Sequence, residues 1–116
     1  GDGFLENGKL AFVAITQKYL DNFIVTGHSF PTNISERDQE RVVKEIERTC
    51  ELVGYSSGPL NFDVMVSEGE VVIIEMSSRN GGNGIPMLIK ESYGFDIEVA
   101  AIQHALGDKA MTVLSV

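Results

Sequence analysis

The sequence predicts an α+β fold in which a mostly antiparallel sheet has its helices packed on one face. Three observations predict this class: turn signals between strands near the start of the chain, a second strand pair further on, and one long amphipathic helix between them. With 116 residues and 43% apolar side chains, the chain fits one domain with a modest core.

The start of the chain predicts strands joined by tight turns. Asn7-Gly8 is a strong hairpin signal, and a strand is expected from Leu10 to Tyr19. The β-rich run from Phe23 to His28 is expected to pair with that strand. Because a domain seldom starts inside a hairpin, we also expect further sequence upstream of Gly1.

A long helix is expected from Glu36 to Val53. Ser35 is a good N-cap, and Gly54 is a typical C-terminal stop. Apolar residues recur at helical spacing and predict one stripe that faces the sheet. The stripe consists of Val42, Val43, Ile46, Cys50 and Val53.

A second hairpin follows the helix. The run from Leu60 to Val66 alternates apolar and polar residues, so that Asn61, Asp63 and Met65 share one face. Glu70 to Met76 is the partner strand, and its continuous apolar run from Val71 to Ile74 predicts burial on both faces.

The rest of the chain predicts a glycine-rich loop and two helices. The loop runs from Ser77 to Gly84, and a short helix then begins near Pro86 and ends at Gly94. Asp96 caps a last helix that ends at Gly107, and a short final strand is expected from Met111 to Val116. The expected inward residues of the last helix are Ile97, Ala100, Ala101, His104 and Ala105.

Composition excludes several classes of function. The net charge of −8 argues against a nucleic-acid partner, which needs clustered Lys and Arg. No apolar run approaches the roughly 20 residues that cross a bilayer, so no membrane partner is expected. Cys50, the one cysteine, is expected to be a small core hydrophobe, which favours a reduced, cytoplasmic setting.

Asp63 and Glu75 are acidic residues inside apolar strands. A buried carboxylate without a partner is costly, and oxygen ligands on strands suit Mg²⁺. A plain two-residue turn would put these two side chains on opposite faces, so we predict an odd loop or a bulge near Glu68-Gly69 that brings them to one face. The alternative is that each acid pairs separately with lysine or arginine.

Arg79 and the glycines after it are the other candidate site residues. The forked donors of Arg79 suit a carboxylate or a phosphate, or they neutralise Asp63 or Glu75. Gly81 and Gly82 let the backbone approach a ligand, unless the loop is merely flexible. Of the two histidines, His28 lies beside a turn and could face the site, whereas His104 is expected in the core.

The two strands of the second hairpin resemble the ATP-grasp superfamily. The residues concerned are Asn61-Phe62-Asp63-Val64-Met65-Val66, followed by Ile73-Ile74-Glu75-Met76-Ser77-Ser78-Arg79. The family's hallmark is an acid on one strand, a Glu about twelve residues later, and then x-Asn-x-Arg. The resemblance covers nearly the whole chain and implies that residues 1–116 are the C-terminal part of an ATP-grasp domain, its N-terminal half being absent from this chain.

The resemblance implies ATP and Mg²⁺, or Mn²⁺, as cofactors. The reaction it implies is activation of a carboxylate as an acyl phosphate, which an amine or similar nucleophile then attacks. The implied site residues are the metal ligands Asp63, Glu75 and Ser77, the cofactor-binding Asp63, Glu75, Gly81 and Gly82, and the catalytic Arg79. The implied partners are a small carboxylate and an amine. The resemblance leaves open whether the protein forms a homo-oligomer.

Two departures from the family limit what the resemblance implies. Ser77 stands where the family usually has Asn, which leaves open a module that binds nucleotide or a partner without catalysis. The bicarbonate-handling residues of biotin carboxylase are absent, so ligation of a larger carboxylate is expected. The family's phosphate-binding lysines belong to the N-terminal half, so this fragment alone is expected to be inactive. Besides a ligase fragment and a non-catalytic binding module, a third hypothesis is an α+β domain with a purely structural role.

Overall fold

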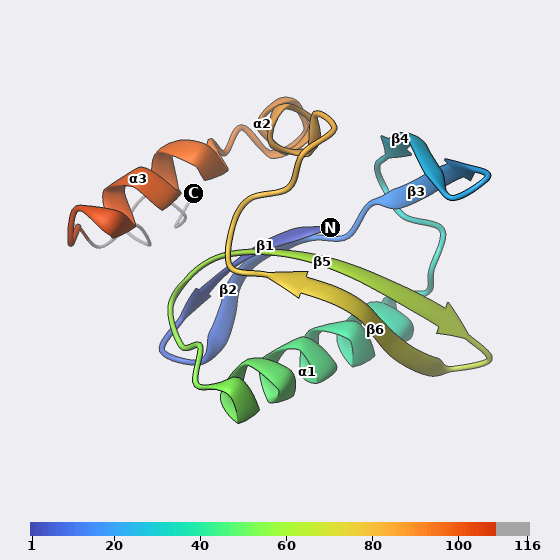
Figure 1. Ribbon diagram of the computed structural model, residues 1–116, viewed down its shortest axis with the longest axis horizontal. Helices are drawn as coiled ribbons and strands as arrows, with labels where there is room; N and C mark the ends of the chain where they lie inside the picture. Colours follow the sequence, from blue (N-terminus) through green and yellow to red (C-terminus); the bar gives the residue numbers. More distant parts are fainter. Residues whose placement is uncertain (109–116) are drawn as a thin grey trace.

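A four-stranded antiparallel sheet forms the centre of the fold (Figure 1), in the strand order β2-β1-β5-β6. The computed structural model describes residues 1–108, so the strand expected from Met111 to Val116 lies outside the described residues. The strands of this sheet are β1 (Asp2–Glu6), β2 (Lys9–Ala14), β5 (Gly58–Ser67) and β6 (Glu70–Ser77). A separate two-stranded sheet pairs β3 (Gln17–Asp21) with β4 (Ile24–Ser29).

The first hairpin forms where the Asn-Gly pair predicts it. Asn7 and Gly8 have positive φ values of 51° and 80°, which suit the tight turn between β1 and β2. The single strand expected from Leu10 to Tyr19 is wrong, because the chain leaves the ladder at Ile15 and Thr16 and starts β3. Strand-forming residues run across this break, so no local signal marks it. β4 does pair with β3, as expected.

Helices cover both faces of the four-stranded sheet. The helix α1 (Glu36–Val53) packs on one face, and α2 (Ile85–Tyr93) and α3 (Ile97–Ala105) lie over the other (Figure 1). The α+β class and the antiparallel sheet are confirmed, but the expectation of all helices on one face is wrong. The reason lies in β1, where the neighbours Phe4 and Leu5 are both buried, one in each core.

The predicted boundaries of α1 are confirmed by its caps. The Ser35 hydroxyl accepts from the N–H of Asp38 at 3.2 Å, and Gly54, with φ of 76°, closes the C-terminus. Cys50 is buried in the core on this face, as expected. Val53 is instead exposed, because the last turn of the helix lies beyond the core. Among the described residues, no helix is long and apolar enough to cross a membrane.

The register of the β5–β6 hairpin contains the predicted irregularity. Glu68 and Gly69 form a two-residue turn with φ of 50° and 78°, flanked by the pair Ser67 and Glu70. The register shifts next to Asp63, so that this residue lies opposite Glu75 rather than opposite Ile74. The bulge therefore exists, but it lies beside the acid pair and not at the turn.

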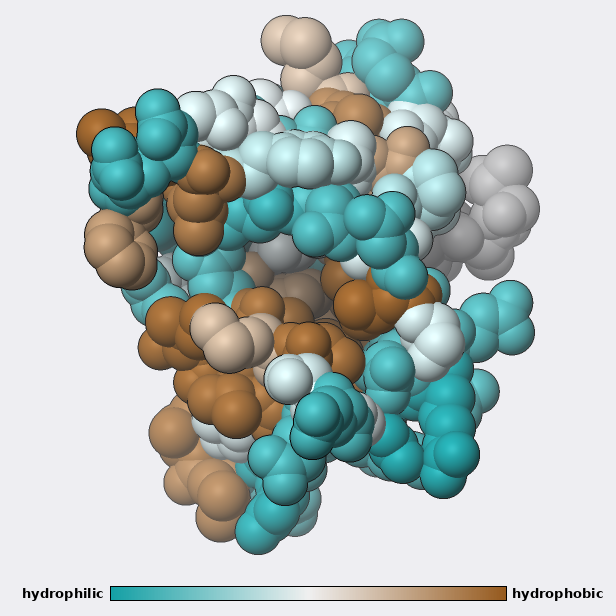
Figure 2. All heavy atoms as spheres, turned by 90° about the vertical axis from the view of Figure 1, so that its right-hand side faces the viewer, coloured by the Kyte–Doolittle hydropathy of each residue, from teal (hydrophilic) through white to brown (hydrophobic). Residues whose placement is uncertain are grey.

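The outer side of β6 is open, contrary to expectation. Val71 and Ile73 pack against the α1 core, but Val72 and Ile74 are 56% and 62% exposed. α2 and α3 cover the sheet only over its other part, so this stretch has one covered face. Figure 2, which looks onto the β3–β4 hairpin and the end of the β5–β6 hairpin, shows apolar surface around a hollow on this side.

We predict that Ile46→Ala, in the core between α1 and the sheet, lowers the free energy of unfolding by about 2–5 kcal/mol. Val53→Ala in the same helix is the control and should change it by less than about 0.5 kcal/mol, because Val53 is exposed. Denaturant unfolding checks both values. Equal losses for the two variants would contradict the assignment of the core.

Candidate functional site

Five oxygen-bearing side chains share one face of the sheet, the face on which α2 and α3 lie. Asp2, Asn61 and Ser77 are paired in one row across β1, β5 and β6, and Asp63 and Glu75 are paired in the next row. Paired residues of a ladder point to the same side, and so do residues two apart in one strand. The prediction that Asp63 and Glu75 face the same side is therefore confirmed.

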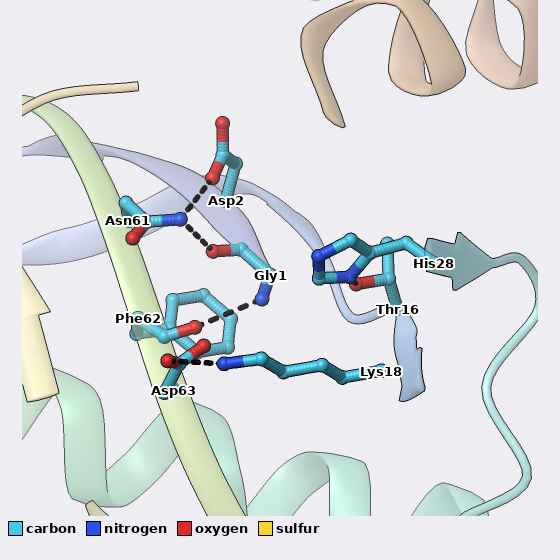
Figure 3. A network of polar contacts seen from close by, with 8 residues as sticks. All are labelled: Gly1, Asp2, Thr16, Lys18, His28, Asn61, Phe62 and Asp63. Atoms are coloured by element: carbon cyan, nitrogen blue, oxygen red, sulfur yellow. Dashed lines mark hydrogen bonds and ion pairs between the residues drawn. The ribbon is translucent and has the colours of Figure 1, made fainter. Parts of the chain in front are cut away.

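Asp63 already has a cationic partner. Its Oδ2 accepts a hydrogen bond from Nζ of Lys18 at 2.7 Å (Figure 3), and Lys18 lies on β3 in the other sheet. The two side chains are 29% and 31% exposed, so Asp63 is neither fully buried nor unpaired, contrary to the sequence argument. The alternative in which an acid pairs with a lysine thus holds for Asp63.

Glu75 differs from Asp63 because it is exposed, and within residues 1–108 it makes no ion pair. Two like charges directly opposite in a ladder are destabilising, so a cation between them is favourable. The described residues contain no cluster of three or more His, Cys, Asp or Glu around one point. The donor set therefore does not fit an all-protein cage, but it fits the Mg²⁺ mode in which one or two carboxylates act with phosphate oxygens and waters.

Asp2 holds the glycine-rich loop against the sheet. Its carboxylate is fully buried; Oδ1 accepts from the Asn61 amide at 2.8 Å (Figure 3), and Oδ2 accepts from the N–H of Gly81 at 2.8 Å. A Cβ on Gly81 would lie 2.6 Å from Asp2 Oδ1, whereas one on Gly82 would meet open space. The missing side chain of Gly81 thus serves a close approach to the sheet, and its N–H is already used.

Arg79 is exposed on the loop that follows β6. Its Nη1 donates to the backbone oxygen of Asn80 at 2.9 Å. In the described part of the chain it makes no ion pair with Asp63 or Glu75, so it does not neutralise either acid. Its guanidinium is available to an anionic group from outside.

A cavity of about 400 Å³ lies between the β3–β4 hairpin and the sheet. Its polar lining residues include Thr16, Lys18, His28 and Asp63, and Met65 and Ile74 add apolar surface. Nδ1 of His28 is hydrogen-bonded to the Thr16 hydroxyl at 2.9 Å. Burial, followed by nearby positive charge, lowers the pKa of His28 below its ordinary value, so the ring is neutral at pH 7.

The other histidine and one larger cavity lie away from these groups. His104 packs edge-on against the ring of Phe4, with centroids 5.5 Å apart. A cavity of about 600 Å³ between β2 and the start of α1 contains none of the candidate site residues. Another cavity, of about 560 Å³, is lined by Gly81 and Gly82 of the glycine-rich loop. The cavity of about 400 Å³ is the one that Asp63 lines, and we take it as the candidate binding site.

Sequence reasoning missed Lys18 and Asp2. Lys18 is 45 residues from Asp63 in sequence, and Asp2 is 79 residues from Gly81, so no local pattern joins them. The one available signal was a charged residue, Asp2, two positions before the apolar Phe4-Leu5 pair. For Asn61, the alternation of β5 correctly predicted that it shares a face with Asp63.

The sheet and the helices have the arrangement of known enzymes: the chain has the fold of ATP-grasp ligases. It resembles phosphoribosylglycinamide synthetase from Anaerococcus prevotii with a TM-score of 0.83 and 22% identity, over 96% of this chain and 29% of that one. It resembles L-amino acid ligase from Bacillus licheniformis with a TM-score of 0.73 and 24% identity, over 90% of this chain and 28% of that one. The fold implied by the sequence resemblance is thereby confirmed.

Two sequence relatives each match 76% of the chain, over 88 residues. A Sinorhizobium fredii protein designated "Uncharacterized protein y4rH" is 27% identical, and the match covers 18% of its length. Carnosine synthase 1 of Homo sapiens is 28% identical, with 11% of its length covered. No protein-family model matches the chain. The chain thus spans less than a third of the length of each of these four proteins.

We predict that Gly81→Ala destabilises the protein by about 1–3 kcal/mol, because the added methyl group meets the carboxylate of Asp2 and the amide of Asn61. Gly82→Ala, one residue later in the same loop, is the matched control and should stay within about 0.5 kcal/mol. Thermal or denaturant unfolding measures the difference. If Gly81→Ala is as stable as Gly82→Ala, the loop is not held as described.

Proposed function

We propose that this chain is the C-terminal part of the ATP-grasp domain of an ATP-dependent ligase. The ligase activates a carboxylate as an acyl phosphate and joins it to an amine or a similar nucleophile. The observation that carries the proposal is the pairing of Asp63 with Glu75 on one face of β5 and β6, beside the loop that bears Arg79. The fold shared with two ligases, and a sequence relative named carnosine synthase, support it.

In this proposal Asp63 and Glu75 hold Mg²⁺ or Mn²⁺ together with phosphate oxygens of ATP, and the hydroxyl of Ser77 is a further ligand. When bound, the cation would neutralise part of the negative charge of the phosphates. The rigid hairpin keeps the two carboxylates in register, so little ordering is needed when the cation arrives. Asp2 contributes indirectly, since it fixes the loop relative to the same strands.

Arg79 is the proposed contact for the substrate carboxylate or the acyl phosphate. Two anionic reactants must approach each other, so preorganised donors lower the barrier. The guanidinium lies in solvent and is not bound to Asp63 or Glu75. The open space at Gly82 leaves room for a ligand against the backbone of this loop.

A second candidate function is a module that binds nucleotide or a partner without catalysis. Ser77 favours it, because a serine hydroxyl is shorter and a weaker metal ligand than the amide that the family usually has there. In either case we propose a cytoplasmic protein whose partners are small molecules: for the ligase, a carboxylate and an amine.

We predict that Arg79→Ala in the intact protein lowers the single-turnover rate of ADP formation by about 10²–10³, with little change in melting temperature. Arg79→Lys should rescue only in part, because an ammonium group cannot make a two-pronged contact. Arg37→Ala, exposed on α1, is the control and should leave the rate unchanged. A panel of carboxylates and amines supplies the substrates.

Three outcomes of that experiment are informative. A variant that melts much lower but turns over normally would show that Arg79 is structural. An intact wild-type protein that binds ATP but forms no ADP with any acid of the panel would favour the non-catalytic module. A loss for Arg37→Ala equal to that for Arg79→Ala would exclude a specific role.

We predict that Glu75→Gln weakens Mn²⁺ binding by about tenfold or more, equivalent to about 1.4 kcal/mol or more. Glu70→Gln, exposed near the turn of the same strand, is the matched control and should bind as the wild type does. Isothermal titration calorimetry or electron paramagnetic resonance measures the affinity. Unchanged binding by Glu75→Gln would support the purely structural reading of the two acids.

A further inference from the structure

Three Asn-Gly pairs lie in turns and loops of the chain, and the fold holds them differently. The pairs are Asn7-Gly8, Asn80-Gly81 and Asn83-Gly84. Such a pair can modify itself, because the backbone nitrogen of the glycine can attack the side-chain amide carbon of the asparagine. Glycine favours this attack, since it has no Cβ to crowd that nitrogen and its backbone is conformationally free. The state of the glycine N–H therefore decides which pair reacts.

In two of the pairs the glycine N–H is already hydrogen-bonded. The N–H of Gly8 donates to the backbone oxygen of Ser56 at 2.8 Å, which ties the β1–β2 turn to the segment before β5. The N–H of Gly81 donates at 2.8 Å to the fully buried carboxylate of Asp2. Either nitrogen must break its hydrogen bond before it can attack, so the fold protects Asn7 and Asn80.

The third pair is open to the reaction. Within residues 1–108 the N–H of Gly84 makes no hydrogen bond, and Asn83 and Gly84 are both exposed. A Cβ on Gly84 would meet open space, so the side chain of Asn83 has room to fold over the nitrogen. Asn83 and Asn7 have nearly the same φ, 54° and 51°. The difference between these two pairs is thus the hydrogen bond of the glycine and not this backbone angle.

The start of α2 also favours the chemistry. Gly84 is the N-cap of this helix, and the first turn contains no acidic residue. The positive end of the helix dipole stabilises negative charge nearby, both on the attacking nitrogen once it has lost its proton and on the carboxylate that forms. The same feature is absent at Asn7, which lies in a turn between two strands.

We propose that Asn83 is a site of spontaneous deamidation. The Gly84 nitrogen loses its proton to solvent and attacks Cγ of Asn83. The new C–N bond closes a five-membered imide ring, and the bond from Cγ to Nδ2 breaks to release ammonia. Water then opens the ring at either carbonyl carbon, which leaves aspartate or isoaspartate at this position. In sum, an amide and water become a carboxylate and ammonium, with no oxidant or reductant.

The product adds a negative charge to the loop that bears Arg79. Asn83 is four residues from Arg79, so their Cα atoms are at most about 14 Å apart. The cavity of about 560 Å³ that Asn83 lines already has one basic and three acidic side chains, those of Lys90, Glu91, Asp96 and Glu98. The added charge therefore opposes an anionic substrate bound by Arg79, a consequence that rests on the proposed function.

The test is a peptide map of the intact protein after incubation in mildly alkaline buffer. Trypsin cleaves after Arg79 and Lys90, so one peptide contains both Asn80 and Asn83, and its fragment ions compare the two sites directly. Asn83 should be modified about tenfold or more faster than Asn80 and Asn7, a factor that corresponds to about 1.4 kcal/mol of barrier. The protein in denaturant is the control, in which the three pairs should react at similar rates.

The map alone decides whether the site exists. A preference for Asn83 that is present in the folded protein and lost in denaturant supports the proposal. Equal rates at the three pairs in the folded protein, or an unmodified Asn83, overturn it.

A second measurement tests the consequence for substrate binding. Asn83→Asp in the intact protein should raise KM for the carboxylate about two- to fivefold relative to Asn83→Gln, the range of exposed charge interactions, with little change in melting temperature. An unchanged KM would overturn this consequence. A wild type that forms no ADP with any acid of the panel contradicts the proposed function instead, and the peptide map still stands.

Discussion

One extra residue in β6 determines where the acidic groups of this protein lie. The turn at Glu68 and Gly69 starts a plain ladder, and continuing that ladder would place Glu75 opposite Phe62, on the face that packs against α1. A carboxylate in that core would be costly. The bulge beside Asp63 instead places Glu75 on the face where the other polar groups of the sheet gather.

The β5–β6 pairing places Asp63 and Glu75, and segments far apart in the sequence contribute the rest of the candidate site. β1 contributes Asp2, which holds the loop after β6, and β3 contributes Lys18, which joins the small hairpin to the sheet. In each contact a hydrogen-bond donor of one segment, the Gly81 N–H or the Lys18 ammonium group, meets a carboxylate of another segment. The sheet supplies rigidity, and the loop and the hairpin supply groups that remain reachable from solvent.

Local features of the sequence were sufficient for much of this architecture. The caps at Ser35 and Gly54 located α1, and parity along the second hairpin required a bulge. Periodicity failed where packing between distant elements decides the outcome. It could not show that α2 and α3 cover the opposite face from α1, nor that they leave Val72 and Ile74 exposed. The contact of Lys18 with Asp63 depends on where β3 turns away from the sheet, which strand propensity does not encode.

The open side of β6 has a consequence for how the protein behaves at high concentration. Among the described residues β6 is an edge strand, so its outer backbone N–H and C=O groups offer a template for a strand of a second chain, and the exposed apolar side chains of Val72 and Ile74 favour such pairing. Glu70 and Glu75 flank this apolar run, and charges in such positions discourage edge-to-edge aggregation. Glu75 thus lies on the face that carries the other polar groups of the sheet, and it also opposes self-association. Neutralising its charge removes a barrier to self-association.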